Sequence, residues 1–144
     1  MSGSRKILLP VTCTFSPDLL KALIVGRLGI TEAEVTLLKV LKVPRASPLD
    51  ENAFSEDIER IEGELRELAG KLEESGMRTN IRVVLARNLV TGIEGCLKGY
   101  DVLILPSESF GGLLRKVLSR ISIERLARRY RTPIVVVGRE LLGC

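Results

Sequence analysis

Short apolar runs alternate with longer amphipathic stretches along the whole chain. Runs that are apolar almost throughout are typical of strands buried on both faces of a parallel sheet. We predict five such strands, at residues 7–11, 34–43, 80–86, 101–106 and 132–138. Helices are predicted between them, at residues 16–28, 54–72 and 88–98 and between the fourth and fifth strands.

The helix over residues 54–72 carries the clearest periodic signal. Its apolar side chains recur every three or four residues and form one stripe: Phe54, Ile58, Ile61, Leu65, Leu68 and Leu72. In three places an acid precedes a base by four residues: Glu56 with Arg60, Glu62 with Arg66, and Glu67 with Lys71. Each such pair stabilises a helix by about 0.3 kcal/mol. The helix that begins near residue 16 has Ser16 as an N-cap and Pro17 at its first position.

Complete alternation of strands and helices predicts the fold class. Parallel strands joined by right-handed helical crossovers form one sheet covered on both faces, a doubly wound α/β sandwich. No repeat or linker divides the chain, so residues 1–144 are expected to form a single domain. In such a fold, ligands bind beyond the carboxyl ends of the strands, which here means the loops at residues 12–16, after Val40 and at 107–122.

Composition removes several classes of function. The chain has no histidine, which excludes imidazole triads, His-ligated metals and histidine pH switches. Cys13, Cys96 and Cys144 form no C-x-x-C pair, so we expect neither a zinc site nor a disulfide framework. The longest uncharged stretch, residues 7–17, is far shorter than the ~20 residues of a membrane-spanning helix. We therefore expect a cytoplasmic protein with no membrane partner and no bound metal.

Charge is distributed unevenly along the chain. The formal net charge is +4, and from residue 107 onward eight basic residues stand against three acidic ones. Residues 50–75 have the opposite balance, ten acids against three bases. Arg125, Arg128 and Arg129 fall on the solvent face of a predicted helix, and few aromatic residues are available to stack bases. Nucleic acid is therefore not the expected partner.

The loop after the fourth predicted strand is rich in small polar residues. These are Ser107, Ser109, Gly111, Gly112, Ser119 and Ser122, and a helix follows them. Two interpretations stay open for this loop: an ordinary turn, or a site in which helix N-terminal amides receive a phosphate.

Five segments in order resemble the universal stress protein family. They are residues 6–11 (KILLPV), 35–40 (VTLLKV), 65–76 (LRELAGKLEESG), 100–105 (YDVLIL) and 123–138 (IERLA through TPIVVVG). The resemblance implies a five-stranded parallel sheet in the order 3-2-1-4-5, no enzymatic activity, and a homodimer joined through the last strand. The residues of that dimer edge are Ile134, Val135, Val136 and Val137, and the alternative is that the tail, residues 139–144, covers this edge.

ATP-binding members of the family have an Asp after the first strand and a G-x-x-G, nine residues, G-S/T motif after the fourth. Thr12 stands at the Asp position, and the motif's glycine positions are occupied by Ser107, Phe110 and Arg120, with Ile121 at its Ser/Thr position. Their side chains should keep backbone amides away from phosphate oxygens, so we expect no ATP bound in the family's manner and no other cofactor.

Some features keep an alternative open, an ATP-binding switch that uses a shifted loop. Val40 matches the position whose backbone meets adenine in ATP-binding relatives. Residues that could rebuild a phosphate site around Thr12 are Ser107, Gly111, Gly112, Ser119 and Ser122, with charge from Arg115, Lys116 or Arg120.

An enzyme is not expected. The chain has no Walker A motif, no G-x-S-x-G elbow and no acidic pair after the first strand. Cys13 lies just before a helix N-terminus, where it is either a reactive thiol or a packed small side chain. The function predicted from sequence is a non-enzymatic regulatory or protective homodimer.

Overall fold

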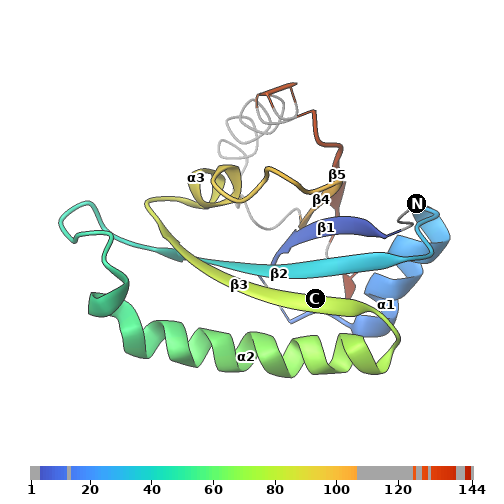
Figure 1. The fold of residues 1–144 in the computed structure, drawn as a ribbon, viewed down its shortest axis with the longest axis horizontal. Coiled ribbons are helices and arrows are strands. Elements are labelled where there is room, and N and C mark those ends of the chain that lie inside the picture. The colour runs from blue at the N-terminus through green and yellow to red at the C-terminus, as the bar shows by residue number, and fades with distance from the viewer. Residues whose placement is uncertain are drawn as a thin grey trace.

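In a computed structural model, the protein has one parallel five-stranded sheet with helices on both faces (Figure 1). The structure describes residues 4–12, 14–106, 125, 128, 129, 131–138 and 142–143. The strands are β1 (Arg5–Pro10), β2 (Ala33–Lys42), β3 (Arg78–Ala86), β4 (Val102–Pro106) and β5 (Ile134–Val137). Their order across the sheet is β3-β2-β1-β4-β5, which confirms the predicted topology.

The helices divide between the two faces of the sheet, as expected for a doubly wound fold. α1 (Pro17–Lys21) and α2 (Ser55–Glu74) lie on one face, and α3 (Leu89–Glu94) lies on the other (Figure 1). A 3₁₀ turn, Glu51–Phe54, leads into α2. Strand side chains alternate between the two faces, so Ile7 and Leu9 pack with α1 and α2, while Leu8 packs with α3.

Capping residues fix where the helices begin and end. Ser16 Oγ accepts the Leu19 N–H at 3.4 Å, and Asn88 Oδ1 accepts the Thr91 N–H at 2.8 Å. Gly76 closes α2 with a φ of +94°, a conformation that favours glycine. These ends match the boundaries predicted from the sequence within a few residues.

The first helix differs from its prediction. The sequence predicts one α-helix over residues 16–28, but α1 gives way to a π-helical segment, Ala22–Arg27. There the Leu28 N–H donates to Leu23 O at 3.0 Å, a bond from residue i to i−5. Leu23 and Ile24 of this segment are buried, as is Leu20 of α1.

The ion pairs of α2 match the prediction in one case. Arg66 lies 3.1 Å from Glu62, as expected. Arg60 lies instead near Asp57, at 3.4 Å, and Glu64, at 3.8 Å, because carboxylates three or four residues away on either side are equally within its reach. These side chains are mostly exposed, so such pairs contribute little to stability.

Neighbouring strands of the sheet differ in how many residues they pair. β2 and β3 are in register over nine residue pairs, whereas β1 and β4 are in register over two, Ile7 with Val102 and Leu8 with Leu103. Asp101 extends the shorter contact. Its N–H donates to Lys6 O at 2.8 Å, and its carboxylate accepts the Lys6 N–H at 2.8 Å. We call the β1–β4 contact with Asp101 the central seam.

Candidate functional site

The carboxyl edge of the sheet has a step between β1 and β2. The last register pair of β1 with β2 is Pro10 with Leu38, followed by a bond from the Val11 N–H to Leu38 O at 2.8 Å. β2 and β3 continue together to Lys42 and Ala86. The last four residues of β2 therefore extend beyond the register with β1, at the edge where doubly wound folds bind ligands.

Val40 lies within this step. Alternate residues of a strand direct their backbone groups to the same neighbour, and Leu38 O faces β1. The N–H and C=O of Val40 therefore face the space beyond the end of β1. The Val40 side chain is buried on the opposite face from α2, where it packs with α3. This is a suitable position for backbone recognition of the edge of a planar ring.

Gly92 of α3 is what lets the helix pack so closely on Val40. A Cβ at Gly92 would lie 2.7 Å from both Val40 Cγ1 and Cγ2, a distance at which neighbouring atoms must move. The end of β2 is thus held against α3 by a glycine contact.

The other predicted nucleotide-binding residues are placed in part. Thr12 is exposed at the end of β1 and shares a pocket with Lys39, the residue before Val40. The remaining predictions for this site lie outside the described residues: Ser107, Gly111, Gly112, Ser119 and Ser122, with Phe110, Ile121, Arg115, Lys116 and Arg120. The structure therefore brings Thr12 and the end of β2 to the same edge.

The pocket beside Thr12 has a volume of about 450 Å³, and we call it the Lys39 pocket. Its sheet side is formed by residues at the ends of β1 and β2: Val11, Thr12, Thr14 and Lys39. Apolar residues of α2 form the opposite wall: Ile61, Leu65 and Leu68. The remaining α2 residues are exposed and charged: Glu64, Glu67 and Lys71.

Lys39 is a residue that the sequence reasoning missed. It occupies a position of β2 between Leu37, which is in the core beneath α1 and α2, and Leu41, which is half-buried against that core. The side chain is half-buried, and Nζ donates to Val11 O at a long 3.4 Å. The signal that could have revealed it is a single cation within an apolar run, VTLLKVL. The pattern of this run predicts only a strand.

Arg87 donates hydrogen bonds to the end of β2 and to the loop that follows it. Its Nη1 donates to three backbone carbonyls, those of Val43, Pro44 and Ser47, the last at 2.6 Å. Arg87 follows directly after β3, so its side chain links the end of β3 to the end of β2 and the start of the loop to α2.

Cys96, the cysteine that the structure describes, is not a reactive thiol. Cys96 is buried beneath α3, as predicted, and burial raises the pKa of its thiol although Arg82 nearby acts in the other direction. Cys96 is accordingly a weak nucleophile. Cys13 and Cys144 lie outside the described residues. Within the described part of the chain, no group of three or more Cys, Asp or Glu side chains could hold a metal ion.

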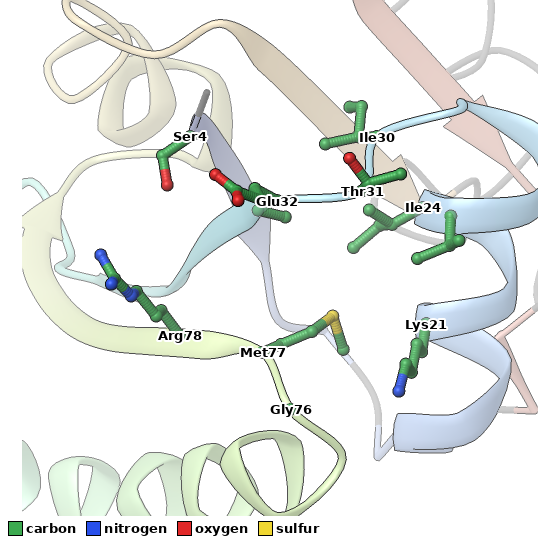
Figure 2. A pocket seen from close by; sticks show the side chains of 11 residues that line it. Ser4, Lys21, Ile24, Ile30, Thr31, Glu32, Gly76, Met77 and Arg78 are labelled. Atoms are coloured by element: carbon green, nitrogen blue, oxygen red, sulfur yellow. The ribbon is translucent and has the colours of Figure 1, made fainter. Parts of the chain in front are cut away.

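A second pocket, of about 430 Å³, lies at the opposite end of the sheet. Figure 2 shows Lys21 of α1 and Met77 and Arg78 at the start of β3 around it. Lys21 Nζ donates to Ser75 O at 2.6 Å, so this lysine caps the end of α2. The pocket lies at the amino ends of the strands, where this class of fold does not usually bind ligands, and we interpret it as structural.

None of the helices in the described residues has the length and apolar character needed to cross a membrane. Arg125, Arg128 and Arg129 are helical and exposed, as predicted, and Arg129 Nη1 donates to Glu94 Oε1 at 2.7 Å. The basic surface is therefore linked to α3.

The order β3-β2-β1-β4-β5, with α1 and α2 on one face and α3 on the other, is the doubly wound α/β fold of universal stress proteins. The chain is similar to hypothetical protein MJ0577, with a TM-score of 0.62 and 19% identity over 94% of this chain and 96% of that one. It is also similar to a universal stress protein from Archaeoglobus fulgidus, with a TM-score of 0.57 and 10% identity over 92% of each chain.

A third similar structure is a universal stress protein in complex with cAMP. The TM-score is 0.54 and the identity 14%, over 93% of this chain and 96% of that one. No protein-family model matches the chain, and no curated protein matches it. The likeness in fold thus agrees with the resemblance found in the sequence.

Proposed function

We propose that this protein is a non-enzymatic regulatory or protective module of the universal stress protein type, cytoplasmic and active as a homodimer joined through β5. The observation that carries the proposal is that β5 is an edge strand, with no further strand paired to it among the described residues. β5 is the last strand of the sheet and pairs with β4 on one side. Edge strands with unpaired backbone groups recruit further strands unless they are protected.

The side chains of β5 favour a partner of the same kind. Ile134 and Val135 are half-buried, and Val136 is 52% exposed, one of the few large apolar side chains on the described surface. A two-fold axis at this edge would pair β5 with its copy and cover Val136. The self-complementary arrangement closes at two chains.

The proposal is tested by replacing Val136 with lysine. We expect the native chain to elute with twice its 15.9 kDa mass in size-exclusion chromatography with light scattering. Val136→Lys should elute as a monomer, because edge lysines are charges that block strand pairing. Asn80→Lys, an exposed position on the opposite edge strand β3, is the matched control and should remain dimeric. A monomeric native chain, or a dimeric Val136→Lys, would contradict the β5 dimer.

The absence of enzymatic activity is supported by the chemistry of the chain. Histidine, the usual general base near neutral pH, does not occur in the sequence. The thiol of Cys96 is buried and its pKa is raised, so it is unsuited to nucleophilic catalysis. We assign no catalytic residue.

Adenine nucleotide binding is the second candidate, and the step beside Val40 favours it. The backbone N–H and C=O of Val40 face the space beyond β1, in the arrangement that can read a purine edge. One protein of the same fold is a universal stress protein in complex with cAMP. The phosphate groups would then depend on the loop that includes Ser119 and Ser122.

Calorimetric titration with ATP and magnesium, and separately with cAMP, distinguishes the two candidates. We expect no saturable heat up to about 1 mM of either nucleotide, because Phe110 replaces a motif glycine and Ile121 replaces the motif's Ser or Thr. Micromolar affinity for ATP that is lost when Ser119 and Ser122 are changed to alanine would support the second candidate. Micromolar affinity for cAMP alone would place adenine recognition at the step without a triphosphate site.

A further inference from the structure

We propose that the Lys39 pocket binds a small organic carboxylate with an apolar body. The anionic head would pair with Lys39, and the apolar body would lie against α2. The proposal is independent of the β5 dimer, because the pocket lies between the ends of β1 and β2 and α2, whereas β5 is at the far edge of the sheet.

The charge of Lys39 is the first step of the argument. The side chain leaves a strand whose neighbouring positions on the same face are apolar: Leu37 is in the core, and Leu41 is half-buried against it. A half-buried ammonium group is partly removed from water, and an ionic partner offsets that cost. In the part of the chain that the structure describes, Lys39 takes part in no ion pair, and its bond to Val11 O is long at 3.4 Å. An anion from outside the chain would supply the missing counter-charge.

The shape and chemistry of the pocket are the second step. The volume of about 450 Å³ is in the range of small-molecule sites. Thr12 and Thr14 add hydroxyl groups beside Lys39, so hydrogen-bonding groups come from the sheet side. The α2 side is apolar, with Ile61 and Leu65 both at most 4% exposed. An amphipathic ligand fits this division better than a wholly polar one.

The balance of charges around the pocket selects the kind of anion. Among the described residues that line the pocket, two are cations, Lys39 and Lys71, and two are anions, Glu64 and Glu67, so their formal charges cancel. A polyphosphate would meet the repulsion of both carboxylates, whereas a single carboxylate needs only the charge of Lys39. The charge balance therefore favours a monoanion and disfavours a triphosphate in this pocket.

Sodium hexanoate is the probe that tests the proposal, with the ¹⁵N-labelled full-length protein observed by NMR. We expect saturable shifts in the amide signals of Val11, Thr12 and Lys39 and of Leu65 and Leu68 on α2. Hexanamide, which has the same length without the charge, should bind at least about tenfold more weakly, as expected when a charge-assisted bond is lost. Acetate, which has the head without the apolar body, should also bind more weakly.

Two lysine variants of the same strand complete the experiment. Lys39→Met should reduce hexanoate affinity by about tenfold or more, because methionine retains an unbranched apolar chain one atom shorter than that of lysine and has no charge. Lys42→Met is the matched control, since Lys42 is an exposed lysine at the end of β2 that does not line the pocket. Its affinity should be that of the native chain.

Three results would overturn the proposal: hexanoate shifts confined to other parts of the protein, equal affinity for hexanoate and hexanamide, or unchanged binding by Lys39→Met. The hexanamide comparison uses the native chain, so it decides the question even if Lys39→Met does not fold.

Discussion

Replacing Leu72 with alanine is expected to lower the free energy of unfolding by about 2–5 kcal/mol, the range for a leucine truncated in a close-packed core. Leu72 is fully buried in the cluster that joins α1, α2 and the sheet. Its backbone oxygen also accepts the N–H groups of Ser75 and Met77, at 3.1 and 3.2 Å, which end α2. The neighbouring backbone is therefore poorly able to collapse into the cavity. Urea denaturation followed by circular dichroism measures the loss.

Leu49→Ala is the matched control for the Leu72 variant. Leu49 is 51% exposed in the loop before α2, so the same chemical change should alter the free energy of unfolding by no more than about 0.5 kcal/mol. Equal effects of the two substitutions would show that Leu72 does not join α2 to the core in the way described.

Gly92→Ala is expected to destabilise the fold by about 1–2 kcal/mol. Overpacking of a full core costs about 1–3 kcal/mol, and alanine recovers up to about 1 kcal/mol of helix propensity. The conflict is with Val40, whose Cγ1 and Cγ2 would lie 2.7 Å from the new Cβ. A β-branched side chain has little rotamer freedom with which to move away. Thermal or urea unfolding measures the change.

Gly95→Ala separates the contact with Val40 from helix propensity. The nearest atoms to a Cβ at Gly95 are Thr91 O at 3.7 Å and Gly92 O at 3.8 Å, which are ordinary contacts. This variant should be as stable as the native chain or slightly more stable. If Gly92→Ala were no less stable than Gly95→Ala, the close packing of α3 on the end of β2 would be refuted.

Most of the fold could be predicted from the pattern of the sequence. The five strands and the boundaries of α2 follow from apolar runs, the 3.6-residue stripe and the Ser75-Gly76 stop, which are local signals. The order of the strands came from the resemblance, because alternation alone permits several orders. The π-helical segment could not be predicted, since its wider turns depend on how Leu23 and Ile24 meet the sheet.

The candidate site could be predicted only in outline. Thr12 and Val40 follow from the resemblance, which marks the position after the first strand and a position near the end of the second, and both lie at the carboxyl edge. Lys39 was missed because a pattern of apolar residues tolerates one cation without changing the strand prediction. Which face that cation occupies, and which part of α2 it meets, depends on tertiary packing. The serines and glycines of residues 107–122 remain predictions.

The central seam has a consequence for how the molecule comes apart. Cooperative units of a protein separate where the fewest interactions cross between them. Along the sheet, β1–β3 form one block and β4–β5 another, and their backbones are bridged by two register pairs and the bonds of Asp101, while side chains of both blocks share the two apolar clusters. Sub-global opening should therefore release β4 and β5 as a unit while the three-stranded block keeps its amides protected from hydrogen exchange. The same block contains the Lys39 pocket, so a ligand there would stabilise the part of the protein that opens last.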